Sequence, residues 1–179
     1  FSACRKTSIL DKAPPNQYTD ATLWSDIGLA DAYLLDAYHG VKIGYTMIML
    51  TAATDDSYGY GNTDYVQGNI SPENYAPWGT SIPDWNDYFN DIQKVNVFLG
   101  KIDGVAKAYP ETKKAEIIEK IKVLKGEALF LRAFCYSQLV RMYGGVPISK
   151  SAFELGQELT SINRSSFEKT INFIVNDCD

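Results

Sequence analysis

Apolar residues recur every three or four positions in several stretches of this chain, which is the spacing that places them on one face of an α-helix. One such stretch predicts a helix over roughly 23–39, and a second predicts a helix that begins near Asp84. A third predicts a helix of roughly 33 residues, or about 50 Å, over 111–143. Long helices in succession, without alternating strands, indicate an all-α fold built as an antiparallel helical array.

The predicted helix 111–143 carries an apolar seam with alternating steps of four and three residues, which suits lengthwise packing on another helix. The seam consists of Ile117, Ile121, Leu124, Ala128, Leu131 and Cys135. Its second half is apolar almost all round, so neighbouring helices should cover most of its sides. Gly144-Gly145 should end the helix, because residues without a Cβ adopt the left-handed conformation found at helix ends.

A last helix should open with the capping box Ser165-x-x-Glu168. Its predicted apolar face consists of Phe167, Ile171, Ile174, Val175 and Cys178. The chain stops at Asp179 before any closing element, so this face, and part of helix 111–143, should be exposed. Segment 45–54 fits either a buried strand or a helix, and the helical context favours a helix.

Residues 55–83 form a long connection that is rich in glycine and proline. Connections of this length are usually functional or disordered. Four tyrosines and a tryptophan favour an ordered loop, because disordered tracts contain few aromatic residues.

Sugars stack on aromatic rings and form hydrogen bonds with amide and carboxylate groups. The candidate ligand-binding residues of this aromatic loop are therefore Trp78, Tyr75, Tyr65, Asn62 and Asp64. The alternative is that the rings fasten the loop to the helices. Calcium binding by the acidic residues is disfavoured, since their spacing matches no EF-hand loop; turn and capping roles are expected, and no metal site is predicted.

The charge pattern and the motifs exclude several function classes. The net charge is −5, and no basic stripe is present to bind nucleic acid. No apolar run is long enough to span a bilayer. The single histidine, His39, lies near a predicted helix end without a nucleophile nearby, and no catalytic or cofactor motif is found. We expect no enzyme activity and no cofactor.

Charged and polar residues inside the predicted helices need partners when they are buried. Glu127 and Arg132 should form structural ion pairs or hydrogen bonds, and Asn96 should be a satisfied core amide. Cys135 and Cys178 are interpreted as small buried apolar residues.

The string EALFLRAFCYSQLVRMYGGVPI, residues 127–148, resembles the signature helix of the SusD/RagB family. Three further segments resemble the family in the same order: Ile9-Leu10-Asp11 with Pro14, the run from Trp85 to Leu99, and Arg164-Ser165-Ser166 with the helix that follows. The family consists of nutrient-binding lipoproteins in the outer membrane of Bacteroidetes. The resemblance implies tetratricopeptide-like repeats, a glycan or oligosaccharide ligand and a SusC-like TonB-dependent transporter as partner. Family members are much longer, so the chain resembles their N-terminal portion.

Small residues precede Cys4, as at the end of a bacterial lipoprotein signal, and together with the resemblance this predicts lipidation of Cys4. Residues 1–21 are then a lipidated tether, and 22–179 are the N-terminal part of the helical domain. The membrane is contacted through the lipid anchor only, and the expected location is the cell surface. Arg5-Lys6 after the cysteine leave the membrane face open, because acidic residues often follow it in surface-exposed lipoproteins.

Two functions remain open from the sequence. The first is a glycan-binding or nutrient-binding lipoprotein that delivers its ligand to the transporter. The alternative is a helical-repeat scaffold that binds only protein. An exposed ring at Trp78 or Tyr75 would favour the first function. Full burial of both rings would favour the second, or a ligand site made wholly by the remainder of a longer protein.

Overall fold

The computed structural model describes residues 19–41, 84–153 and 162–179. Within these ranges every regular element is helical, which confirms the predicted all-α class. The elements are α1 (Asp20–Leu23), α2 (Ile27–Leu35), the 3-10 helix η1 (Asp36–Val41), α4 (Trp85–Val105), the 3-10 helix η4 (Ala106–Ala108), α5 (Glu111–Tyr143) and α6 (Phe167–Cys178). The predicted helix at 45–54 and the aromatic loop 55–83 lie outside the described residues.

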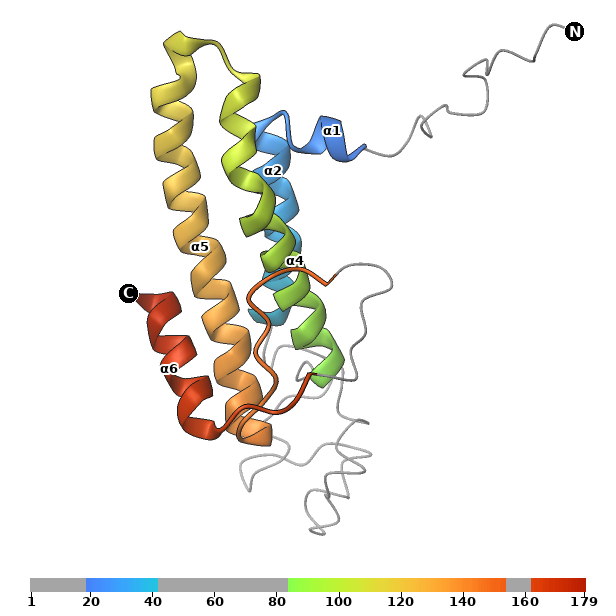
Figure 1. Ribbon diagram of the computed structural model, residues 1–179. Coiled ribbons are helices and arrows are strands. Elements are labelled where there is room, and N and C mark those ends of the chain that lie inside the picture. The colour runs from blue at the N-terminus through green and yellow to red at the C-terminus, as the bar shows by residue number, and fades with distance from the viewer. Residues whose placement is uncertain (1–18, 42–83, 154–161) are drawn as a thin grey trace, which may run out of the picture.

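The helices α2, α4, α5 and α6 alternate in direction, so neighbours are antiparallel (Figure 1). α4 and α5 lie side by side, with α2 and η1 packed against them on one side. α6 packs on the C-terminal half of α5 on the other side. The predicted antiparallel array is therefore confirmed.

The helix predicted over 23–39 is divided into three elements. Asp26 interrupts it, because its carboxylate accepts hydrogen bonds from the backbone N–H groups of Gly28 and Leu29 and so caps a new helix, α2. The last part tightens into the 3-10 helix η1. The apolar spacing predicted one helix because all three elements bury the same face. The break at Asp26 arises from a side-chain hydrogen bond to the backbone, which the apolar spacing does not reveal.

The predicted start of α4 and both predicted bounds of α5 are confirmed. Asp84 caps α4 in a reciprocal capping box with Asp87. α5 runs from Glu111 to Tyr143, and Gly144 ends it with a φ of 73°. Gly145 is required for a different reason than expected: a Cβ there would collide with the backbone carbonyl of Ser165, where the chain returns toward α6.

Two groups of buried side chains form the core. The apolar cluster joins α2 and η1 to the C-terminal half of α4 and the N-terminal half of α5, and it includes Leu34, Val95, Phe98, Ile102 and Leu131. The aromatic cluster lies at the opposite end of α4 and α5, and it comprises Tyr88, Ile92, Cys135, Tyr136, Leu139, Val146 and Phe173. The predicted α5 seam is buried along its whole length, which confirms that it packs against neighbouring helices.

The start of α6 differs from the prediction. Ser166 is the N-cap, and its hydroxyl accepts a hydrogen bond from the backbone N–H of Lys169. The predicted N-cap, Ser165, is therefore wrong by one position, and Glu168 is not at the third helical position that a capping box requires. The sequence was ambiguous because either of the two neighbouring serines can cap a helix.

The buried face of α6 also differs from the predicted apolar face. Thr170 and Phe173 are the buried residues of α6, and Cys178 is exposed rather than buried. Phe167 and Val175 are exposed by 58% and 48%, which confirms the expected exposure of their side of the helix.

Candidate functional site

The residues predicted to bind a ligand all lie outside the described part of the chain. They are Trp78, Tyr75, Tyr65, Asn62 and Asp64, and the predicted lipidation site Cys4 also lies outside it. Their roles therefore stay predictions. The described residues do form one larger open groove, which the sequence did not predict.

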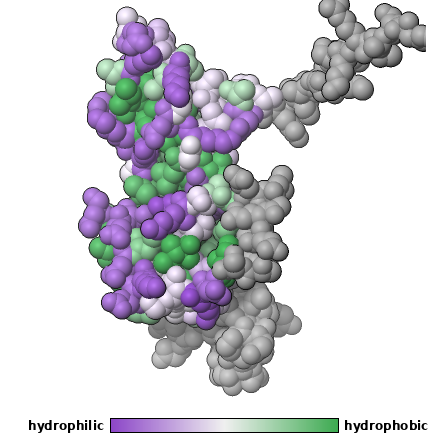
Figure 2. Space-filling view, viewed as in Figure 1, coloured by the Kyte–Doolittle hydropathy of each residue, from purple (hydrophilic) through white to green (hydrophobic). Residues whose placement is uncertain are grey.

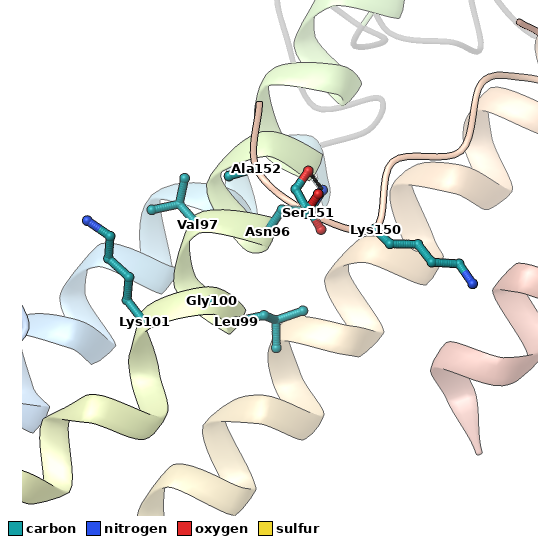
Figure 3. Close-up of a pocket in the computed structure, with 8 residues that line it drawn as sticks. All are labelled: Asn96, Val97, Leu99, Gly100, Lys101, Lys150, Ser151 and Ala152. Atoms are coloured by element: carbon teal, nitrogen blue, oxygen red, sulfur yellow. Dashed lines mark hydrogen bonds between the residues drawn. The ribbon is translucent and has the colours of Figure 1, made fainter. Parts of the chain in front are cut away.

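This groove, here named the α4 groove, has a volume of about 410 Å³. One wall is the middle of α4, and the other is the segment 150–152 that follows α5 (Figure 3). Its lining residues are Asn96, Val97, Leu99, Gly100, Lys101, Lys150, Ser151 and Ala152. No aromatic ring is among them, so the groove lacks the stacking platform expected of a sugar site.

Side-chain amides on α4 hold the second wall in place. The Asn96 Nδ2 atom donates to the backbone carbonyls of Ser149 and Ser151, each at 3.2 Å. Gln93 exchanges two hydrogen bonds with the backbone of Phe153, at 2.9 and 3.2 Å. These amides substitute for the backbone partners that an irregular segment lacks, so they are occupied by structural bonds.

Arg132 connects the groove wall to α6. Its guanidinium donates two hydrogen bonds to Asp177, at 2.7 and 2.8 Å, and a third at 2.7 Å to the Asn96 Oδ1 atom. It also lies over the ring of Phe173 at 5.1 Å. The predictions that Arg132 forms a structural ion pair and that Asn96 is a satisfied core amide are both confirmed. Glu127 is half-buried.

The two lysines of the α4 groove do not converge on a common point, because their side chains point away from each other (Figure 3). Lys101 forms an ion pair with Asp20 and lies over the ring of Trp24 at 5.8 Å. Its hydrogen bond to the carboxylate of Asp20 lowers the pKa of that group. The groove therefore has no paired cationic centre for an anionic ligand.

Two buried side chains of α5, Cys135 and Tyr136, are unsuited to nucleophilic chemistry. Burial raises the pKa of the Cys135 thiol to about 12 and that of the Tyr136 hydroxyl to about 12, so both stay protonated near neutral pH. Cys135 is buried, which confirms its interpretation as a small apolar residue. His39 is exposed in the last turn of η1.

Asp91 is a buried acid that sequence reasoning missed. Its Oδ1 atom accepts a hydrogen bond from Lys94 at 3.1 Å, while its Oδ2 atom has no hydrogen-bond partner and faces Gly40. Burial raises the pKa of Asp91. Asp91 lies three residues after Tyr88 and four residues before Val95, both buried, and this helical spacing was the available signal.

In the described ranges, no three His, Cys, Asp or Glu side chains are grouped so that they could hold a metal ion. No helix in those ranges is both long enough and apolar enough to cross a bilayer.

Comparison with known proteins identifies the family to which this helical fold is similar. A family model described as "Starch-binding associating with outer membrane", SusD-like, matches residues 10–179. A SusD-like protein of Formosa agariphila is 24% identical over 180 residues, covering 96% of this chain and 33% of the relative. The chain thus spans about a third of the length of the relatives it matches.

Solved structures agree with the family match. A SusD-like protein from Bacteroides fragilis superposes with a TM-score of 0.61 at 25% identity, covering 93% of this chain and 31% of that structure. A SusD homologue from Bacteroides thetaiotaomicron gives a TM-score of 0.61 at 21% identity, covering 89% of this chain and 31% of that structure. These likenesses confirm the tetratricopeptide-like helical array. This chain belongs to the SusD-like family.

Proposed function

We propose that this chain is the N-terminal part of a cell-surface lipoprotein that binds a glycan and delivers it to a SusC-like TonB-dependent transporter of the outer membrane. The observation that carries the proposal is the family match over residues 10–179, in a family described as starch-binding and associated with the outer membrane. A binding role is also compatible with the buried polar side chains Arg132, Asp177 and Asn96, which form structural hydrogen bonds with one another and with the segment after α5.

The ligand site of the proposal is the aromatic loop. The test is native electrophoresis of the family-length protein in gels that contain starch or another neutral polysaccharide. Replacing Trp78 or Tyr75 by alanine should raise the dissociation constant obtained from the retardation roughly tenfold, equivalent to about 1.4 kcal/mol. Tyr58 and Tyr60 provide matched controls, because they are rings of the same loop that are not assigned to the site.

The possible outcomes test the glycan-binding function and the assignment of its residues separately. Retardation that survives Trp78→Ala and Tyr75→Ala would contradict the residue assignment and leave the glycan function standing. Failure of the unaltered protein to bind any polysaccharide in the panel would contradict the function and favour the protein-binding scaffold.

Lipid anchoring and the transporter partner are tested separately. Cys4→Ser should move the protein from the membrane fraction to the soluble fraction, whereas Cys178→Ser should leave it in the membrane fraction. The transporter should co-purify with the anchored protein, and its gene should lie next to the gene for this chain. A Cys4→Ser protein that stays in the membrane fraction would contradict lipidation at that residue.

A further inference from the structure

A buried acid lies where η1 packs on α4. Hydrophilic residues make up much of the surface seen in Figure 2, whereas Asp91 of α4 is only 1% exposed. Its carboxylate lies against the backbone of Gly40 in η1, because a Cβ at Gly40 would be 2.7 Å from the Asp91 Oδ2 atom. The same Cβ would be 3.4 Å from the Sγ atom of Cys135 on α5. η1 therefore covers this carboxylate, and displacing η1 would open it to water.

The two oxygens of this carboxylate are in different environments. Oδ1 accepts a hydrogen bond from the ammonium group of Lys94 at 3.1 Å, whereas Oδ2 has no hydrogen-bond partner in the part of the chain that the structure describes. An ionised carboxylate is solely an acceptor, and burying an acceptor without a donor is unfavourable, most of all when it is charged. Protonation removes that charge, so the docked position of η1 favours the neutral acid.

Charged neighbours only partly offset this burial. The ammonium group of Lys94 is shared, because it also pairs with Asp36 of η1 at 2.8 Å. Lys94 and a charged His39 of η1 favour the ionised form of Asp91, whereas Asp36 favours the neutral form. On α5, burial raises the pKa of the facing Cys135 thiol to about 12, so this group stays uncharged. Burial is the largest of these influences, and it raises the pKa of Asp91.

We propose that Asp91 is a proton-dependent latch for η1: as a neutral acid it lets η1 stay docked on α4 and α5, and as a carboxylate it favours displacement of η1. In the docked state the pKa of Asp91 lies above its ordinary value of 3.8, and in the displaced state, where water reaches the carboxylate, it returns to that value. The stabilisation of docked η1 by the proton is therefore fully present below the ordinary value and is lost as pH rises through the raised pKa.

The position of the latch in the chain gives it a consequence. The chain continues from η1 towards the aromatic loop, so the latch acts on the last described element before that loop. The latch itself does not depend on the glycan-binding proposal, because it concerns only the contact of η1 with α4 and α5.

The test is amide hydrogen exchange of the family-length protein, followed by mass spectrometry, from about pH 4 to about pH 7. Peptides that cover η1 should, after correction for the intrinsic rate at each pH, exchange severalfold faster at the upper end of this range. Asp91→Asn should abolish that increase, because the amide matches the carboxylate in size and cannot ionise. Asp91→Ala should abolish it as well, and this second variant buries no polar group in place of the acid.

Asp103→Asn is the matched control, since Asp103 is an exposed acid of the same helix that pairs with Lys125 rather than with η1. It should keep the wild-type increase. Peptides around Leu131 in α5 report global unfolding, and their exchange should not follow the η1 profile. Exchange of η1 that is independent of pH in the wild type would overturn the proposal, as would an increase that survives both Asp91 variants. An equal increase in the Leu131 peptides would also overturn it, because the proton would then act on the whole fold rather than on η1.

Discussion

The two core clusters join the same pair of helices by different means. In the apolar cluster, aliphatic and aromatic side chains of α2, α4 and α5 fill space between helices, and the buried members are all apolar. Beside the aromatic cluster, charged and amide side chains at Arg132, Asp177 and Asn96 form directional bonds between α4, α5 and α6. The regular helices are joined mainly by apolar packing, with ion pairs such as Lys125 to Asp103 at the exposed rim. The irregular segment after α5 and the short helix α6 are positioned by buried hydrogen bonds.

This difference has an energetic consequence. Apolar packing tolerates substitutions that conserve volume. A buried charge tolerates no loss of its partner, because the remaining charge is left without compensation. The end of the array that carries the aromatic cluster should therefore be more sensitive to polar substitutions, and the other end to changes in volume.

The largest expected effect is at Arg132. Arg132→Ala leaves the carboxylate of Asp177, whose side chain is 7% exposed, without its partner. We expect the free energy of unfolding to fall by about 3–5 kcal/mol, measured by urea denaturation. The double variant Arg132→Met with Asp177→Leu should recover most of that loss, because it removes both charges and keeps apolar volume. A single variant as stable as the wild type would show that the ion pair contributes nothing to holding α6.

The next effect sharpens the contrast at the apolar cluster. Leu34 is 1% exposed, and Leu34→Ala should lower the free energy of unfolding by about 3 kcal/mol through loss of apolar contacts and formation of a cavity. Leu34→Met should cost less than about 1.5 kcal/mol, because the volume is conserved. Similar losses for both variants in urea denaturation would contradict the view that volume alone matters at this end.

Tyr136 tests the polar bonds of the aromatic cluster. Its hydroxyl accepts a hydrogen bond from the backbone N–H of Ser149 at 2.8 Å. Tyr136→Phe leaves that buried N–H group without an acceptor, and we expect a loss of about 2 kcal/mol in the free energy of unfolding. A loss below the error of the urea measurement would show that this bond does not fix the segment after α5.

The same residue predicts a pH dependence. Tyr136 has a pKa raised to about 12 by burial, whereas an unfolded tyrosine has a pKa of about 10. Between these values the unfolded chain releases the proton and the folded chain keeps it, so the stabilisation present below about pH 10 is lost as pH rises. The free energy of unfolding of the wild type, relative to that of Tyr136→Phe, should fall by about 1.4 kcal/mol per pH unit across this window. Subtracting the two curves cancels the titration of Cys135, and a constant difference would contradict the burial of the hydroxyl.

Local signals explain which parts of the fold could be predicted. The start of α4 and the end of α5 follow from residues at those positions, Asp84 and Gly144, so the sequence was sufficient for them. The need of Arg132 for a partner was also predictable from burial. The identity of that partner was not, because Asp177 lies 45 residues further along the chain and is brought close only by the packing of α6.

The candidate site was harder to predict for the same reason. The α4 groove exists because Asn96 holds the backbone of Ser151 against α4, and this contact joins positions 55 residues apart. Neither the residue composition nor the apolar spacing predicts a contact between residues so far apart in the sequence. The aromatic loop, by contrast, was identified from composition, and its assignment to a ligand stays a prediction.

The smallest expected effect concerns the first turn of α6, which belongs to the end of the array held by directional bonds. Ser166 caps this helix through its hydroxyl, whereas Ser165 donates its backbone N–H to the carbonyl of Val146 at 3.1 Å. Ser166→Ala should therefore lower the free energy of unfolding by about 1 kcal/mol, and Ser165→Ala should change it by less than about 0.5 kcal/mol. Both variants remove one hydroxyl from adjacent positions, so the pair is closely matched in urea denaturation. Equal losses would show that the two serines share the capping role, and a larger loss at Ser165 would restore the capping box expected from the sequence.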